Sequence, residues 1–155
     1  MFKKLIGFYT MDAEQRRLFC QAAVLLPLTW GGLRLFGINR TAIWLDTWAD
    51  RLCPPTPLSD PNVYVHRARQ ALYLAIEYGL DRGKRDKICL RRALVMRWLL
   101  RKQGIANVLH IGVGRDRDNQ FMAHAWLNYQ GTCLVGGRKA PQFTPFAEPI
   151  EPIRR

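Results

Sequence analysis

Two side chains of this sequence could together carry out nucleophilic chemistry on a carbonyl group. Cys89 opens an apolar, helix-forming stretch, and His124 stands thirty-five residues later within an alternating, strand-forming stretch. A thiolate attacks a carbonyl carbon, and a neighbouring imidazole can take the thiol proton and later protonate a leaving amine. The pair predicts a nucleophile and a base, with a carboxylate or amide needed to orient the imidazole.

The surroundings of Cys89 favour nucleophilic chemistry over the alternative of a buried, unreactive cysteine. The N-terminus of a helix stabilises an anion through its macrodipole, and its free backbone N–H groups are the expected oxyanion donors. Basic residues flank the cysteine on both sides, at Lys84, Arg85, Lys87, Arg91 and Arg92. For His124, the alternative is a structural histidine with no part in chemistry.

The residue that should orient His124 is missing from its expected place. A two-residue hairpin loop at 130–131 would pair His124 with residue 137 of the following strand. An orienting carboxylate is therefore expected at position 136 or 137, where this chain has Gly136 and Gly137. The sequence predicts a Cys89–His124 dyad without an assured third member.

Four other residues near His124 in the sequence or the predicted sheet have side chains of a suitable kind to orient it. Asn128 shares the strand face of His124, but four residues along a strand is about 13 Å at about 3.3 Å per residue, which is too far. His110, on the preceding strand, is a candidate because the sequence does not fix the register of that strand. Asp116 and Asp118 belong to the intervening turn and are expected to be too distant.

The elements that must position these residues predict an α+β fold. Helical spacing predicts four helices, at 12–36, 41–52, 62–79 and 89–103. Pro27 or the Gly31-Gly32 pair is expected to break the first helix. The last helix is apolar over most of its circumference, so it should be central and buried. A change to period two predicts three strands, at 105–114, 120–129 and 132–135.

Prolines suggest how the chain is divided. We expect an N-terminal helical region over 1–53, a Pro-rich linker over 54–61, a catalytic core over 62–139, and a Pro-rich, extended or loosely attached tail over 140–155. A chain of 155 residues is long enough to bury one core.

The net charge of +12 favours acidic partners. The basic residues do not form a nucleic-acid-binding signature, so no nucleic acid is expected. The four cysteines lie far apart, which gives neither metal-ligand spacing nor a disulfide framework; we expect reduced thiols in a cytoplasmic protein, with no metal or cofactor. Cys20 and Cys133 have apolar neighbours and are expected to be packing residues.

An apolar run near the N-terminus, Leu18 to Leu33, covers sixteen residues and falls short of the roughly 20 that span a bilayer. No small-residue cleavage site follows it. We expect an amphipathic helix that either packs on the core or rests on a membrane surface. In the second case the protein would be peripherally membrane-associated.

Several motifs together resemble a known family. They are Cys89-Leu-Arg-Arg-Ala-Leu, Leu109-His-Ile-Gly-Val113, Ala123-His-Ala-Trp126 and Gln130-Gly131. This pattern, over about residues 60–137, is similar to the leader peptidases of bacterial lasso-peptide biosynthesis. These are transglutaminase-like cysteine proteases that remove the leader from a ribosomally made precursor.

The resemblance implies a transglutaminase-like, papain-like core in which Cys89 is the nucleophile and His124 the general base. It implies an aspartate at 136 or 137, where this chain departs from the family. It also implies three partners: the precursor peptide, a separate leader-recognition protein and an ATP-dependent macrolactam synthetase. Two alternatives stay open. One is a weakened or inactive scaffold on the same fold that binds precursor and synthetase, and the other is a basic protein that binds a membrane surface or nucleic acid.

Overall fold

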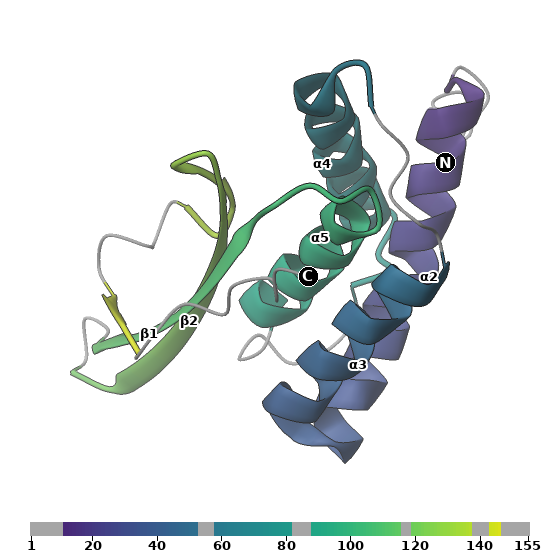
Figure 1. The fold of residues 1–155 in the computed structure, drawn as a ribbon. Helices are drawn as coiled ribbons and strands as arrows, with labels where there is room; N and C mark the ends of the chain where they lie inside the picture. Colours follow the sequence, from purple (N-terminus) through teal and green to yellow (C-terminus); the bar gives the residue numbers. More distant parts are fainter. Residues whose placement is uncertain (1–10, 53–57, 82–87, 116–118, 138–142, 147–155) are drawn as a thin grey trace.

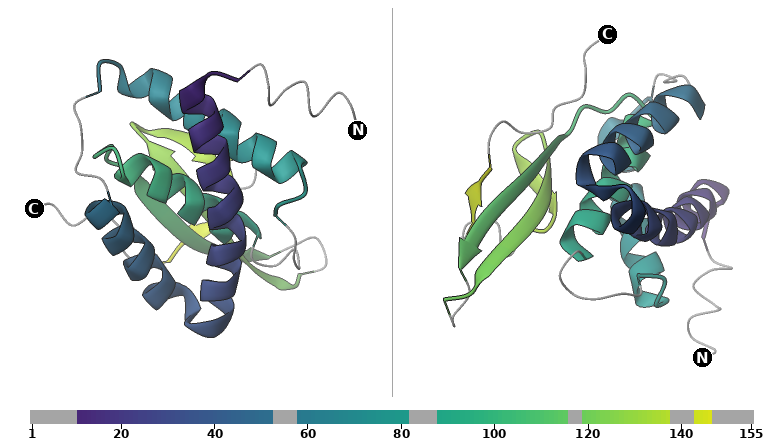
Figure 2. Two further views of the ribbon diagram at one scale, coloured as in Figure 1. Left: turned by 90° about the vertical axis from the view of Figure 1, so that its right-hand side faces the viewer. Right: turned by 90° about the horizontal axis from the view of Figure 1, so that it is seen from below.

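A layer of helices packs against one face of a small antiparallel sheet (Figures 1 and 2). The computed structural model describes residues 11–52, 58–81, 88–115, 119–137 and 143–146. The helices are α2 (Ala13–Leu35), α3 (Gly37–Leu52), α4 (Pro61–Glu77) and α5 (Ile88–Arg101). The strands are β1 (Val108–Arg115), β2 (Phe121–Tyr129), β3 (Thr132–Val135) and β4 (Thr144–Pro145). The α+β class predicted from the sequence is confirmed.

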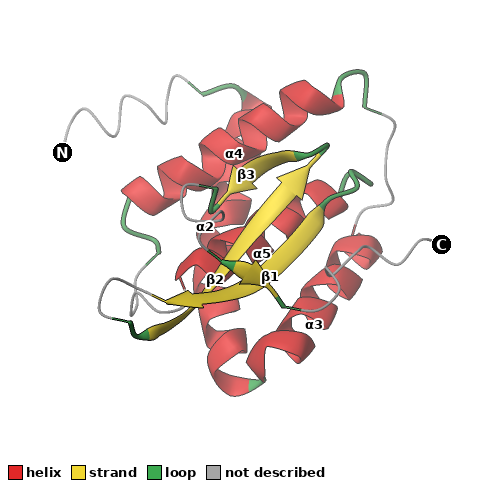
Figure 3. Cartoon of the chain, turned by 90° about the vertical axis from the view of Figure 1, so that its left-hand side faces the viewer, coloured by secondary structure: helices red, strands yellow, loops and turns green. Residues whose placement is uncertain are grey.

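Helix α5 lies at the centre, between the other helices and the sheet (Figure 3). Every residue from Ala93 to Leu100 is buried, as its nearly uniform apolar composition predicts. The two arginines on its polar side meet carboxylates of α3: Arg97 binds Asp46 at 2.8 Å, and Arg101 binds Asp50 at 3.0 Å. A buried guanidinium needs such a partner because isolated charge is costly in the core.

Helix α2 is continuous, so the predicted break at Pro27 or Gly31-Gly32 is wrong. Pro27 faces solvent, which limits the cost of its missing N–H group. Gly32 instead serves packing, since a Cβ there would lie 3.0 Å from the Thr41 methyl group on α3. Helix α3 begins at Gly37, four residues earlier than predicted. Thr41 therefore lies inside the helix, where its hydroxyl donates to the Gly37 carbonyl.

The strand order is β3-β2-β1-β4 (Figure 3). The predicted two-residue loop between β2 and β3 is confirmed by the pairing of Tyr129 with Thr132. A bulge between Leu127 and Asn128 then shifts the register by one residue. Strand β4 was not predicted; it comes from the expected extended tail and pairs with β1, with Gly112 opposite Pro145.

The N-terminal helices share the core of the rest of the chain. Helix α2 is long and apolar enough to cross a membrane by length and composition alone, yet a third of its apolar window is buried, and α2 packs on α4 and α5. The proposed division at 53/54, 61/62 and 139/140 stays a prediction; most of the linker and tail lies outside the described residues.

Candidate active site

Cys89 lies in the first turn of α5, which begins at Ile88, and is partly exposed. It lines a cavity of about 830 Å³, which we call the Cys89 cavity. His124 of β2 lines the same cavity, together with Tyr73 of α4 and Gly136 after β3. The fold thus brings the two residues singled out in the sequence to one cavity, from separate elements.

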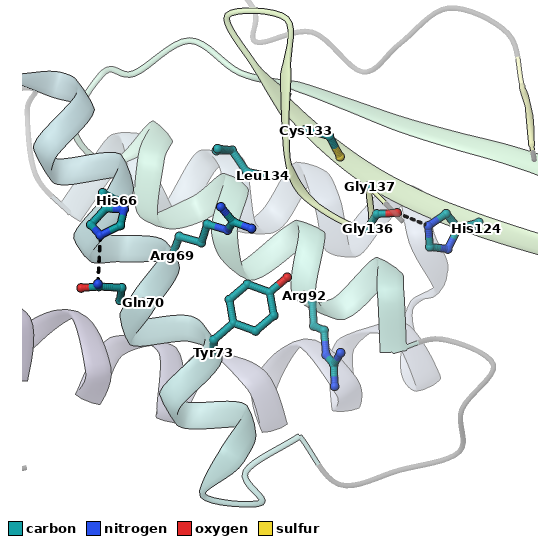
Figure 4. Close-up of a pocket in the computed structure, with 10 residues that line it drawn as sticks. All are labelled: His66, Arg69, Gln70, Tyr73, Arg92, His124, Cys133, Leu134, Gly136 and Gly137. Carbon is teal, nitrogen blue, oxygen red and sulfur yellow. Dashed lines mark hydrogen bonds between the residues drawn. The ribbon is translucent and has the colours of Figure 1, made fainter. Parts of the chain in front are cut away.

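The imidazole of His124 is held on three sides. It is 8% exposed, and its ring lies 4.9 Å from the ring of Phe143 and 6.1 Å from that of Trp126, centroid to centroid. Its Nε2 atom lies 2.8 Å from the carbonyl oxygen of Gly136 (Figure 4). A carbonyl oxygen only accepts, so Nε2 carries the proton, and Nδ1 of the neutral ring is left with a lone pair that can accept one.

Both residues are described, and no hydrogen bond joins them in this arrangement. Ala125 and Leu127 point from β2 into the core, so alternation places His124 on the other face of the strand. Catalytic hydrogen bonds are often long before substrate binds and tighten in the complex. The arrangement places a thiol and an imidazole in the wall of one cavity, with the imidazole on the strand face opposite the core and without a hydrogen bond between the two side chains.

Gly136 takes the place of the expected orienting carboxylate, through its main chain. Its φ is +85°, and an added Cβ would lie 2.6 Å from the Ala125 carbonyl oxygen, so no side chain fits at this position. The predicted pairing of His124 with residue 137 is wrong, because the bulge shifts the register and β3 ends at Val135. Position 136 nevertheless lies beside the histidine, and a neutral carbonyl replaces a charged group there.

His110 and Asn128, the other candidates that lie among the described residues, do not orient His124. His110 stacks on Trp126 at 5.3 Å between centroids, and its Nε2 atom lies 3.3 Å from Nδ2 of Asn128. Asn128 therefore does not reach His124, as the spacing along the strand predicts. Asp116 and Asp118 lie outside the described residues.

The positive charge of the arginines that follow Cys89 is partly neutralised by a carboxylate that was not predicted from the sequence. Asp81, at the end of the α4–α5 connection nearest α4, binds Arg91 at 2.6 Å and Arg92 at 2.7 Å. Asp81 and Arg91 are both almost fully buried, whereas Arg92 is 29% exposed. Arg91 and Arg92 thus share the Asp81 carboxylate. Lys84, Arg85 and Lys87 lie outside the described residues.

The remaining cysteines differ from each other. The Cys133 thiol donates to the Val135 carbonyl at 3.2 Å, and burial raises its pKa, as expected of a packing residue. Cys20 is exposed on α2, so its prediction as a packing residue is wrong. Cys53 lies outside the described residues. Within the described ranges, no group of three or more histidine, cysteine or acidic residues could hold a metal ion.

Comparison with known proteins assigns the chain to a family. No curated protein and no solved structure is significantly similar to this chain. Residues 33–148, which include all the helices and strands from α3 to β4, match the transglutaminase-like superfamily. The match covers Cys89, His124 and Gly136 and extends over most of the sequence. The chain therefore belongs to the transglutaminase-like superfamily, whose members are commonly cysteine proteases.

Proposed function

We propose that this chain is a cysteine peptidase with Cys89 as the nucleophile and His124 as the general base. The observation that carries the proposal is that both side chains line one cavity while Gly136 fixes the tautomer of the histidine. Cys89 sits where backbone N–H groups of a helix start lack intrahelical partners. These features supply the nucleophile, the base and the oxyanion donors of an acyl transfer.

The proposed reaction begins when Nδ1 of His124 takes the thiol proton of Cys89. The thiolate attacks the scissile carbonyl carbon, and the oxygen of the tetrahedral intermediate accepts hydrogen bonds from N–H groups in the first turn of α5. The intermediate collapses, the C–N bond breaks, and the imidazolium protonates the leaving amine. Water, deprotonated by His124, then hydrolyses the thioester, and the thiolate of Cys89 leaves and regains its proton.

The Gly136 carbonyl performs only part of the role of an orienting carboxylate. It holds the ring and selects the tautomer, but it carries no full charge to stabilise the imidazolium. Where an orienting group is changed so that the tautomer is wrong, rates fall by about 10⁴. Because the tautomer here is correct, we expect a smaller deficit and a working dyad.

The finer proposal is a leader peptidase that processes a ribosomally made lasso-peptide precursor. Its support is the resemblance of the motifs around Cys89 and His124, together with a net charge of +12 that would suit an acidic leader or partner. A separate leader-recognition protein and an ATP-dependent macrolactam synthetase are the partners proposed with it.

The test combines the full chain with a lasso-peptide precursor and its leader-recognition protein, and follows leader release by mass spectrometry. We expect release by the wild type, no detectable release by Cys89→Ala, and near-normal release by the matched control Cys20→Ala, which removes an exposed thiol of α2. Equal release by the wild type and Cys89→Ala would remove Cys89 as the nucleophile.

A non-catalytic scaffold is the second candidate. The observation that favours it is the combination of glycine at the orienting position with no hydrogen bond between Cys89 and His124. It predicts that precursor and synthetase bind while no variant, including the wild type, releases the leader. Neither glycine offers a place to restore the carboxylate: Gly136 has no room for a side chain, and a Cβ at Gly137 would meet the Cys133 side chain.

A further inference from the structure

A second cavity adjoins the Cys89 cavity, between α4 and the β2–β3 hairpin. We call it the α4 cleft; its volume is also about 830 Å³. The two cavities share Tyr73, Arg92, His124 and Gly136 in their walls, so a peptide lying across the site would run from one into the other. No aspartate or glutamate among the described residues lines either cavity.

Arg69 is the unusual residue of the α4 cleft. Every other arginine of α4 and α5 binds a carboxylate: Arg67, Arg91, Arg92, Arg97 and Arg101. Arg69 has no carboxylate partner among the described residues. Its guanidinium lies 5.8 Å from the ring centroid of Tyr73, and both side chains point from α4 into the cleft (Figure 4). Stacking on an aromatic ring holds the planar guanidinium in place with its N–H donors unused.

A second positive charge reinforces Arg69. Arg92 lines both cavities and shares its partner Asp81 with the buried Arg91. Among the described residues, the cleft therefore combines an arginine without a carboxylate partner, a second arginine in its wall and no acidic wall residue. Such a concave basic wall attracts anions more strongly than the same charges on a flat surface.

We propose that the α4 cleft binds an acidic side chain of the peptide that the Cys89 cavity processes, with Arg69 as the residue that selects it. This inference rests on the proposed peptidase function. A carboxylate fits a guanidinium fork through two parallel hydrogen bonds, which gives selectivity as well as affinity. Arg69 lies one helical turn, about 6 Å, from Tyr73. Tyr73 lines both cavities, so Arg69 lies about two residues of extended peptide beyond their shared wall.

Binding is tested first, without catalysis. The probe is a pool of nine-residue peptides with aspartate at the central position and random neutral residues elsewhere; a second pool carries asparagine there. Binding to the full-length Cys89→Ala protein is measured by fluorescence anisotropy. We expect about tenfold tighter binding of the aspartate pool. Adding Arg69→Gln should abolish the preference, whereas Arg17→Gln, which removes an exposed arginine of α2, should retain it.

Equal preference in the Arg69→Gln and Arg17→Gln proteins would overturn the cleft proposal, because the attraction would then be due to net charge alone. Turnover separates this failure from that of the peptidase proposal. If Arg69→Gln lowers kcat/KM only for the aspartate pool, and Arg69→Glu reverses the preference towards a lysine pool, the cleft selects substrate. Selective binding through Arg69 with no cleavage by the wild type would support the cleft and overturn the peptidase.

Discussion

Two regions of the molecule leave side chains uncovered, and the side chains are of opposite kinds. The Cys89 cavity and the α4 cleft together present a thiol, an imidazole and the guanidinium of Arg69. Helices α2 and α3 form a hairpin (Figure 2). This α2–α3 hairpin presents apolar groups instead: Leu35 and Phe36, at the junction of the two helices, are 75% and 61% exposed. Polar groups in a concave wall suit bond-making chemistry, whereas apolar groups on a projecting turn suit contact with another apolar surface. Substitutions in one region should therefore leave the activity of the other unchanged.

The strongest test of this separation is His124→Ala. Removing a general base lowers kcat by about 10²–10⁴, and the hairpin is untouched, so any surface binding should persist. His110→Ala is the matched control, since His110 stacks on Trp126 and binds Asn128 without reaching the Gly136 carbonyl. Leader release is followed by mass spectrometry and folding by circular dichroism. Similar losses in both variants would mean that the sheet, and not the base, was damaged.

Gly136→Ala should reduce both stability and activity. Its φ of +85° and the 2.6 Å approach of an added Cβ to the Ala125 carbonyl predict a loss of at least about 2 kcal/mol in the free energy of unfolding. Gly137→Ala is the control; its Cβ would meet the Cys133 sulfur at 3.1 Å, which can shift, and we expect less than about 1 kcal/mol. Urea denaturation measures both. Equal losses would argue against a specific role for the Gly136 backbone.

The sequence predicts the frame of the site better than its details. Periodicity placed α5, β2 and the hairpin loop because each is long or carries strong turn chemistry. The bulge after Leu127 leaves no local signal, so the register next to Gly136 could not be predicted. A main-chain contact such as that between the Gly136 carbonyl and His124 also cannot be predicted from residue types, because every residue has a carbonyl group. Asp81 was missed because its partners, Arg91 and Arg92, are fixed only once α5 packs beside the end of α4.

The Cys133 thiol of the α4 cleft should respond to pH differently in the folded and the unfolded chain. Burial raises the pKa of the Cys133 thiol, with the charge of Arg69 opposing the shift to a smaller extent. The thiolate is thus disfavoured in the folded state, so the stabilising contribution is complete at neutral pH and is lost as pH rises through the shifted pKa. In a Cys20→Ser, Cys53→Ser, Cys89→Ser protein, alkylation of Cys133 should begin at higher pH in the folded chain than in urea. Alkylation at the same pH in both states would contradict this.

The smallest expected effect concerns the hairpin and the predicted peripheral membrane contact. From Gln15 to Leu45 the sequence has four arginines and no acidic residue, and large apolar side chains project along the same stretch. An anionic bilayer attracts such a surface through its headgroups and its acyl boundary together.

Replacing the two exposed side chains at the junction of α2 and α3, as Leu35→Ser with Phe36→Ser, should weaken binding to vesicles of phosphatidylcholine and phosphatidylglycerol by about tenfold. Val63→Ser, on α4 and 48% exposed, is the control for loss of one exposed apolar side chain elsewhere. Flotation measures the bound fraction, and leader release by both proteins should stay normal. If the double variant floats as well as the control, the hairpin is not a membrane contact, and its apolar surface must be covered by a protein. Failure of leader release in the double variant would show that the two regions are not independent.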